Sequence, residues 1–405
     1  MSFSRDVHRR DFLKTLLAAG AGAALSGKAG LAAESAAKGP ALVKSKVPTR
    51  SFGKTGVQVS CLGLGGMFDT AKNQLVLRRA RDLGVTYWDA ADCYNFGGPS
   101  EIGSGNFFAA NPGSRKEIFL VTKSDARDPA GIDKLLARSL ERLQTDYIDL
   151  YFIHGIHGIS ELNDDTKSWA EKAKKAGKIK FFGFSTHSNM EDCLSGAAKL
   201  GWVDGIMFSY NYRLMQKSNM KAAVEACAKA GIGLTAMKTQ GGGSVKADSQ
   251  AELDIGGIFL NRGFTDAQAK LKAVWENPQI ACICSQMPTL AILTSNVAAS
   301  MNLTKLATAE LDRLEQHAAE TREGYCAGCG EICAAAAGVP VNDVMRHLMY
   351  HHSYGDPDLA RSEFARLPAD IRARLATLDF SDAERRCPQG MPIAQLMKEA
   401  AELLA

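Results

Sequence analysis

The sequence lacks the charge surplus that nucleic-acid-binding proteins usually carry. Its 405 residues include 48 Lys and Arg against 44 Asp and Glu, which leaves a formal net charge of +4. Proteins that bind by neutralising phosphates concentrate a larger basic excess on one face. The composition also lacks the biases of collagen, coiled coils or disordered chains, because hydrophobic residues make up 46% and charged residues 23%. We therefore expect a folded protein that does not bind nucleic acid.

The sequence also has no long uninterrupted hydrophobic run near its start. The apolar stretch at residues 15–25 is short and is interrupted by Gly20 and Gly22, whereas a membrane-spanning helix needs about 20 apolar residues. We therefore expect no stable membrane span. The stretch follows Arg9 and Arg10 and ends in small residues, which is the layout of a cleavable export signal.

The paired arginines, followed by Phe12, Leu13 and Lys14, resemble the twin-arginine signal of bacteria. The resemblance implies that the twin-arginine machinery exports the chain to the periplasm after it has folded, often with a cofactor already inserted. We expect residues 1–33 to be the signal and residues 34–47 to be a linker.

Downstream, short β-rich apolar runs alternate with longer stretches of helical period, which is the pattern of parallel βα units. Eight strands are predicted, at residues 59–65, 85–90, 118–123, 147–154, 179–185, 205–210, 233–238 and 280–285. Eight such units over about 255 residues suit a closed barrel, whereas a doubly wound open sheet usually has about five or six strands. We predict an α/β fold: a (β/α)8 TIM barrel over residues 48–302, then a smaller helical module over residues 303–405.

Four consecutive predicted strands end in, or just before, polar side chains that an apolar barrel lining would not select. These side chains are Asp89 with Tyr94, Lys123, His154, and Ser185 with Thr186. In such barrels, reactive side chains project from the carboxyl ends of several strands, so the group could form a proton-transfer cluster. Each residue alone also has a structural explanation, such as a rim ion pair between Lys123 and Asp89.

Several stretches resemble the aldo-keto reductases. Residues 49–65, TRSFGKTGVQVSCLGLG, resemble the opening hairpin of that family. Its later motifs are matched in order by YWDAADCY at 87–94, GPSE at 98–101, VTK at 121–123 and DYIDLYFIH at 146–154. The resemblance covers residues 48–302 and implies a nicotinamide-dependent enzyme acting on a small carbonyl or alcohol. It also implies a catalytic tetrad of Asp89, Tyr94, Lys123 and His154.

The chemistry of these four residues suits carbonyl reduction. The reaction puts a hydride on carbon and a proton on the oxygen, which becomes negative in the transition state. Tyr94 would supply the proton. A free tyrosine has a pKa of about 10, and we expect the nearby Lys123 cation to lower it while Asp89 holds the lysine in place. His154 would orient the carbonyl.

The same resemblance implies the residues that bind NADP or NAD. They are Gly65, Asp89, Ser185, Thr186, Met207, Tyr210, Ser285 and Asn296. Ser185 would hold the nicotinamide carboxamide and Tyr210 would stack near the ring. The loop from Ser285 to Asn296 has no Lys or Arg that would pair with an adenosine 2'-phosphate, so the choice between NADPH and NADH stays open.

A cysteine cluster follows the predicted barrel. Cys326, Cys329 and Cys333 have C-x2-C-x3-C spacing, and the distant Cys387 precedes a proline. Clustered cysteines with a remote Cys-Pro are typical of bacterial ferredoxins, so these four residues are expected to bind one 4Fe-4S cluster. Zinc and, in an exported protein, disulfides are the alternatives. Three nearby histidines are expected on a helix surface and not as ligands; they are His347, His351 and His352.

These patterns lead to two hypotheses. The first is an exported aldo-keto reductase-type oxidoreductase in which two-electron carbonyl chemistry occurs beside a one-electron cluster that could serve an electron-transfer partner. The alternative is a non-catalytic redox sensor or partner-binding protein on the same scaffold. Met207, which stands where glutamine is common in the family, and the missing basic residues of the late loop favour this alternative slightly.

Overall fold

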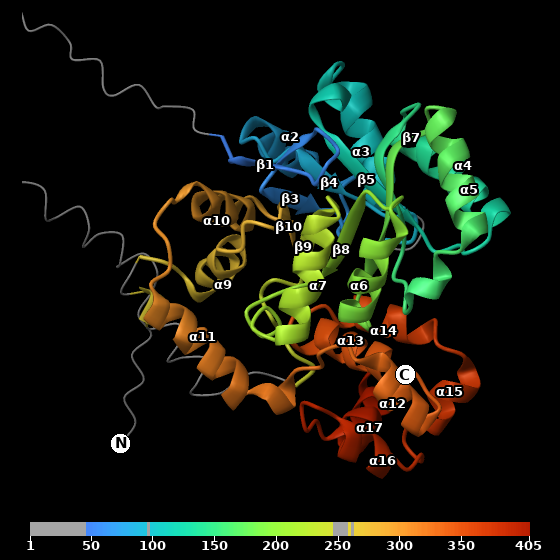
Figure 1. Cartoon of the computed structure of the whole chain (residues 1–405), viewed down its shortest axis with the longest axis vertical. Coiled ribbons are helices and arrows are strands. Elements are labelled where there is room, and N and C mark those ends of the chain that lie inside the picture. Colours follow the sequence, from blue (N-terminus) through green and yellow to red (C-terminus); the bar gives the residue numbers. More distant parts are fainter. Residues whose placement is uncertain (1–45, 95–97, 246–257, 261–262) are drawn as a thin grey trace, which may run out of the picture. The chain divides into compact units, whose positions relative to one another are not determined.

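The structure is a computed structural model that describes residues 46–94, 98–245, 258–260 and 263–405 (Figure 1). The predicted signal, residues 1–33, and most of the predicted linker, residues 34–47, lie outside these ranges. Residues Ser45–Ala405 form one compact unit.

Eight parallel strands close into a barrel, which confirms the predicted (β/α)8 fold. In chain order the strands are β3 Leu62–Gly65, β4 Tyr87–Asp89, β5 Phe119–Ser124, β6 Ile148–Ile153, β7 Ile179–Thr186, β8 Gly205–Ser209, β9 Gly233–Met237 and β10 Cys282–Gln286. The last strand, β10, pairs with β3 and closes the ring. All eight carboxyl ends therefore share one face, where this architecture places its reactive side chains.

The first predicted strand, residues 59–65, is wrong as a single element. Val59 pairs with Arg50 in an antiparallel hairpin, and the barrel strand begins only at Leu62. The hairpin consists of β1 Thr49–Ser51 and β2 Gln58–Ser60. Both halves of the predicted run are apolar and buried, so hydrophobicity alone could not reveal the break between them.

The hairpin plugs the amino-terminal end of the barrel. Its Phe52 is fully buried. A Cβ built on Gly233 would lie 2.4 Å from the Phe52 ring, and one built on Gly205 would lie 2.9 Å from it. Glycine at the start of β8 and β9 therefore makes room for this aromatic side chain.

Helices surround the barrel between the strands. They are α2 Gln74–Asp82, α3 Pro99–Ala110, α4 Pro129–Leu143, α5 Asp164–Lys175, α6 Met190–Leu200, α7 Ser218–Lys229, α9 Asp266–Trp275 and α10 Leu290–Met301. Some begin at side-chain caps: Asp128 accepts from the Gly131 amide at the start of α4, and Thr265 with Gln268 forms a capping box at α9. Within the described residues, no helix combines the length and apolar character that crossing a membrane requires.

The chain after the barrel forms further helices with their own apolar core. They are α11 Thr308–Glu320, α12 Gly330–Ala337, α13 Val341–His352, α14 Pro357–Ala365, α15 Ala369–Arg374, α16 Ser381–Arg386 and α17 Ile393–Leu403. Leu348, Phe364 and Met397 belong to this second core. Helix α11 is different, because its Leu314 packs with Tyr212 of the barrel loops.

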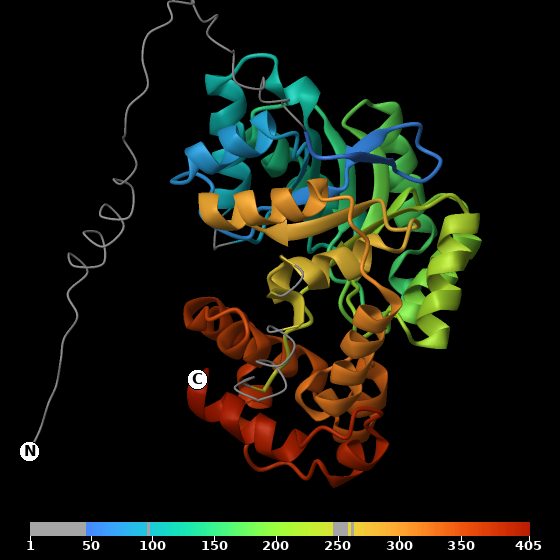
Figure 2. The same cartoon turned by 90° about the vertical axis from the view of Figure 1, so that its left-hand side faces the viewer.

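The helices α13 and α14, here called the roof helices, cover the carboxyl ends of the strands. Asn342 of α13 donates to Ser188 Oγ at 2.6 Å, just after β7. The Ser244 hydroxyl, after β9, donates to the Met345 carbonyl oxygen at 2.8 Å. Figure 2 shows the C-terminal helices, in orange and red, gathered at one end of the barrel. The polar strand ends therefore lie beneath a helical roof.

Gly183→Ala is predicted to destabilise the barrel. A Cβ on Gly183 of β7 would lie 1.8 Å from the Gly205 carbonyl oxygen of β8, so the two paired strands would have to separate. Overpacking of this kind costs about 1–3 kcal/mol, and we expect the upper end of that range because the obstacle is backbone. The measurement is the free energy of unfolding or the fall in Tm.

Gly158→Ala is the matched control, because the nearest atom to its built Cβ is the Ser160 hydroxyl oxygen at 3.7 Å. Equal losses of stability in the two variants would contradict the prediction.

Candidate active site

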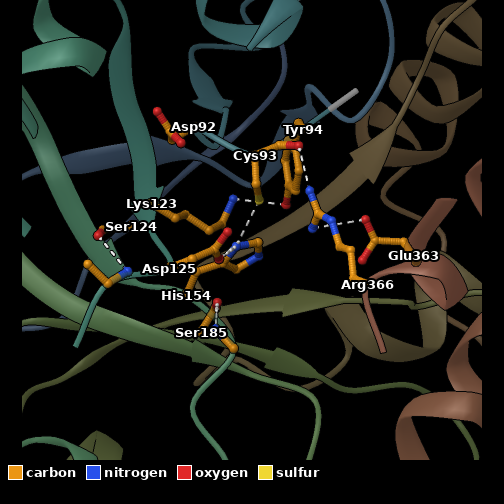
Figure 3. Close-up of polar contacts among 12 residues, drawn as sticks. Asp92, Cys93, Tyr94, Lys123, Ser124, Asp125, His154, Ser185, Glu363 and Arg366 are labelled. Carbon is orange, nitrogen blue, oxygen red and sulfur yellow. Dashed lines mark hydrogen bonds and ion pairs between the residues drawn. The ribbon is translucent and has the colours of Figure 1, made fainter. Parts of the chain in front are cut away.

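Three of the four predicted catalytic side chains meet at the carboxyl ends of β4 and β5. The Lys123 ammonium donates to Asp89 Oδ1 at 2.5 Å, to the Ala90 carbonyl oxygen at 2.8 Å and to the Tyr94 hydroxyl oxygen at 3.0 Å. The Lys123 and Asp89 side chains are 0% and 3% exposed. Figure 3 shows Lys123 and Tyr94 pointing toward one another. This buried ion pair fixes the ammonium within reach of the phenol.

The fourth residue, His154, follows β6 and lies beside Tyr94, with ring centroids 5.7 Å apart. Its Nδ1 is 2.8 Å from Asp125 Oδ1 and 3.3 Å from Cys93 Sγ (Figure 3). A carboxylate can only accept a hydrogen bond, which assigns the hydrogen to Nδ1 and leaves Nε2 for another partner. Sequence reasoning missed Asp125 and Cys93, although Asp125 follows Lys123 by two residues and Cys93 directly precedes Tyr94.

A partly buried ionic network supports the segment that carries Tyr94. Asp92 accepts two hydrogen bonds from Arg138, both at 2.6 Å, and one from Arg142 at 3.1 Å. Arg142 also contacts Glu101, which accepts from Thr122 of β5 at 2.7 Å. The motif that contains Glu101 therefore joins α3 to the barrel, and its role here is structural.

The pKa of Tyr94 is raised overall in this structure, and not lowered as expected from the nearby Lys123. Burial raises the pKa of Tyr94 well above its ordinary value, and the Asp89 carboxylate raises it further. Burial likewise raises the pKa of Asp89 against the opposing effect of Lys123. The phenol is protonated at neutral pH, which is the state that a proton donor needs.

The site opens into a cavity of about 300 Å³, a size found among small-molecule sites. The barrel lines it with Asp89, Tyr94, His154, Met207, Met237 and Lys238, among others. The roof helices and the residues beside them add Arg346, Tyr350, Leu359, Glu363 and Arg366. Sequence reasoning assigned the C-terminal region to metal binding alone and so missed its contribution to this wall.

The predicted cofactor residues divide into two groups. Gly65, Asp89 and Met207 line the cavity. Ser185, Thr186, Tyr210, Ser285 and Asn296 do not line it.

The second group makes hydrogen bonds inside the protein. The Thr186 hydroxyl donates to the Ile156 carbonyl oxygen at 2.8 Å, and Ser185 Oγ accepts from the Gly155 amide at 3.0 Å. In place of these two side chains, His187 faces the cavity. The assignment of cofactor residues stays a prediction.

Two members of the second group hydrogen-bond to each other, since Asn296 donates to Ser285 Oγ at 3.1 Å. Tyr210 is buried, and its hydroxyl accepts from Asn277 at 2.9 Å. The Tyr210 ring is thus packed inside the protein, and its predicted place beside the nicotinamide stays a prediction.

The four predicted metal-ligating cysteines border one small cavity among the C-terminal helices. They are Cys326, Cys329, Cys333 and Cys387. None of the ten cysteines of the chain is in a disulfide, so the structure does not show the disulfide alternative. Burial raises the pKa of Cys326 to about 12, and the other three sulfurs add to the rise. Gathered thiols of this kind become thiolates when a cation binds them.

The spacing of these sulfurs bears on which metal they fit. Four thiolates held at about 2.3 Å from one zinc lie about 3.8 Å apart. In the described part of the chain, no three of the four cysteine sulfurs lie within 4.8 Å of one another. Cys93, Asp125 and His154, at the barrel site, are the described residues whose ligand atoms do lie this close together. A four-iron cubane holds its ligands farther apart than a single ion does. Within the described ranges, these four sulfurs therefore do not have the mutual spacing of ligands around a single zinc ion.

The expected surface position of His347 is wrong. This side chain is 2% exposed, and its ring lies edge-on to Phe364, with centroids 6.3 Å apart. Helix α13 turns His347 toward α14 along with its apolar neighbours, so the histidine belongs to the second core. His352 is only partly buried and pairs with Glu399 at 2.8 Å.

A model of the aldo/keto reductase family matches residues 61–317, which is more than half of the chain. The chain belongs to the aldo/keto reductase family. The match passes the predicted barrel boundary at residue 302 and includes most of α11. Members of the aldo/keto reductase family are oxidoreductases, and this supports an enzyme of that class.

Individual aldo/keto reductases match parts of the chain. It is 35% identical over 183 residues to aldo-keto reductase yakc of Schizosaccharomyces pombe, whose name specifies NADP(+), covering 41% of this chain and 52% of that protein. It is 37% identical over 153 residues to the uncharacterized oxidoreductase YqkF of Bacillus subtilis, covering 34% and 48%. The chain thus spans about half the length of these curated relatives.

The solved structure of aldo-keto reductase AKR11C1 from Bacillus halodurans, in its holo form, shares the fold. Its TM-score is 0.56 at 23% identity, over 67% of this chain and 96% of that one.

A model of the twin-arginine translocation pathway signal sequence matches residues 6–26. This confirms the predicted signal and supports export by the twin-arginine route to the periplasm.

Asp125→Asn is predicted to make Cys93 more reactive. Burial raises the pKa of Cys93, and the Asp125 carboxylate raises it further because two negative charges repel. Removing that charge lowers the pKa, so more thiolate is present at pH 8. We expect alkylation of Cys93 by iodoacetamide to become roughly three- to tenfold faster, because the rate follows the thiolate fraction. Peptide mass spectrometry gives the rate.

Glu161→Gln is the control, since Glu161 pairs with Arg127 and not with Cys93. An unchanged rate in Asp125→Asn would contradict the assigned contact.

Proposed function

We propose that the protein is an exported oxidoreductase that reduces a small carbonyl compound, or oxidises the corresponding alcohol, with NADPH or NADH. The observation that carries this proposal is the convergence of the Lys123 ammonium on both the Asp89 carboxylate and the Tyr94 hydroxyl at the wall of the cavity. Family membership supports the same class of reaction.

The cavity wall beside Tyr94 fits a flat, weakly polar ring. Met207 and Met237 present thioether side chains there, from β8 and β9, and such side chains adapt to aromatic surfaces. These residues would hold the nicotinamide ring. When bound, the dinucleotide supplies or accepts the hydride.

The chain's own groups handle the proton. Tyr94 donates its hydroxyl proton to the carbonyl oxygen as negative charge develops there. The phenolate that remains lies 3.0 Å from the Lys123 ammonium, whose charge stabilises it in this buried setting. His154, held through Nδ1 by Asp125, would direct Nε2 at the carbonyl oxygen and position it.

Tyr94→Phe is predicted to abolish most carbonyl reduction. General acid catalysis typically contributes about 10²- to 10⁴-fold, so kcat should fall at least roughly 100-fold while the Kd for the dinucleotide changes less than about twofold. The assay is a panel of small aldehydes, quinones and sugars with saturating NADPH or NADH.

Tyr147→Phe serves as the control, because its ring packs against Arg115 and Lys180 and does not line the cavity. Full turnover by Tyr94→Phe would reject the assigned acid. Dinucleotide binding without any turnover by the wild type would favour the sensor hypothesis instead.

We also propose that Cys326, Cys329, Cys333 and Cys387 hold one 4Fe-4S cluster. Their shared cavity and their C-x2-C-x3-C spacing with a remote Cys-Pro support this assignment. A bound cluster supplies one-electron transfer. Cys326 also borders a second cavity together with His187 and Lys238, which line the active-site cavity. The cluster would therefore lie close enough to the barrel site to influence it or to serve an electron-transfer partner.

Protein purified without oxygen from the exported fraction is predicted to contain about four iron and four sulfide per chain. Cys329→Ser and Cys387→Ser should lower both contents because each removes a ligand. Cys227→Ser, a change in α7 outside the cysteine cavity, should leave them unchanged. Stoichiometric zinc without iron in the wild type would overturn the cluster.

A further inference from the structure

Lys238 directly follows β9 at the wall of the active-site cavity. Its backbone has a φ of 56°, a left-handed conformation that residues with a Cβ rarely adopt. The surroundings hold it there: the Lys238 carbonyl oxygen accepts from Asn211 Nδ2 at 3.1 Å and from the Gly241 amide at 3.1 Å. Unusual backbone geometry that is held in this way is characteristic of functional sites.

Within the part of the chain that the structure describes, the charged residues that line the cavity are paired, except for Lys238. The pairs are Asp89 with Lys123, Asp125 with His154, Arg127 with Glu161, Arg346 with Asp343, and Glu363 with Arg366. Among the described residues, Lys238 Nζ makes no hydrogen bond or ion pair, and its recorded contact is with the face of the Tyr350 ring, 4.9 Å from the centroid. An ammonium enclosed with only an aromatic face as partner is incompletely compensated.

The Arg346 guanidinium adds a second positive charge to this part of the cavity wall. Burial and the Arg346 guanidinium lower the pKa of Lys238 well below its ordinary value. Burial and Lys238 in turn lower the pKa of His187. All three side chains line both the active-site cavity and the second cavity next to it. A negative group placed between them would relieve the repulsion and complete their hydrogen bonds.

We propose that Lys238, from the barrel, and Arg346, from the roof helix α13, form a subsite for an anionic group, a carboxylate or a phosphate, of the bound ligand. The inference rests on the proposed function only for the position of the reacting carbonyl at Tyr94. Two sources would present this chemistry: an acidic group on the carbonyl substrate, or the pyrophosphate of the dinucleotide.

Binding to the whole protein is the first test, and it does not depend on turnover. Calorimetric titration with benzoate and with inorganic pyrophosphate should show binding of at least one of them to the wild type. Lys238→Met should weaken that binding roughly tenfold or more, the scale of one charge-assisted hydrogen bond, and Lys238→Arg should restore it. Lys238→Met removes a buried amine that makes no hydrogen bond within the described residues, so this variant should fold. Lys229→Met, on the exposed face of α7, is the control.

Kinetic measurements then distinguish the two sources. If the substrate carries the anion, Lys238→Met raises KM for 4-carboxybenzaldehyde roughly tenfold and leaves KM for benzaldehyde within about twofold. If the dinucleotide carries the anion, Lys238→Met raises the Kd for NADPH roughly tenfold. The ratio of the KM for 4-carboxybenzaldehyde to the KM for benzaldehyde is then the same as in the wild type.

Either pattern supports the subsite. Equal binding of benzoate, pyrophosphate and NADPH by the wild type and Lys238→Met overturns it, as does the absence of anion binding by the wild type. If the wild type turns over neither aldehyde, the proposed function fails, while the titrations still decide whether the subsite exists.

Discussion

The ammonium of Lys123 is the group on which the rest of the active site depends. It lies inside the barrel with no exposed surface, where an unpaired charge would cost several kcal/mol. An ammonium has three hydrogens, and three acceptors surround this one: the Asp89 carboxylate, the Ala90 carbonyl oxygen and the Tyr94 hydroxyl. All three acceptors are needed to offset the cost of burying the ammonium. The hydrogen bonds that stabilise the charge therefore also fix the position of the Tyr94 phenol oxygen. The Asp92 network holds the connecting segment from the other side.

The barrel could be predicted from the sequence because each strand is a short buried run bounded by helical periodicity, and this pattern is local. The break between β2 and β3 could not, since Val59 and Leu62 are both buried and only their partners differ. The tetrad was predictable for a related reason: its members end neighbouring strands, and parallel strands bring their ends together. The pKa of Tyr94 was not predictable, because it depends on how fully the phenol is enclosed and not on which charges are nearby in sequence.

The remaining parts of the site depend on contacts between distant segments. The ligand pattern of the four cysteines is visible in their spacing, but nothing in residues 341–365 indicates that Arg346 and Tyr350 line a cavity made mostly by the barrel. Similarly, the sequence does not show that Lys238, just after β9, differs from other lysines at the rim of the barrel. The difference lies in the structure, where the other charged residues around the cavity are already in ion pairs. Ser185 and Thr186 stand at a strand end and make hydrogen bonds to backbone groups inside the protein, a detail that the strand pattern does not reveal.

The order of segments along the chain has a consequence for maturation. The residues that the C-terminal region contributes to the cavity wall lie between Cys333 and Cys387 in the sequence. A metal group bound by both cysteines would therefore link the two ends of this segment. Fixing the ends of a long loop restricts the unfolded chain and favours the folded arrangement. The catalytic pocket would then become complete only after synthesis of the whole polypeptide and loading of its cysteines, a timing compatible with a transport route that accepts proteins already assembled.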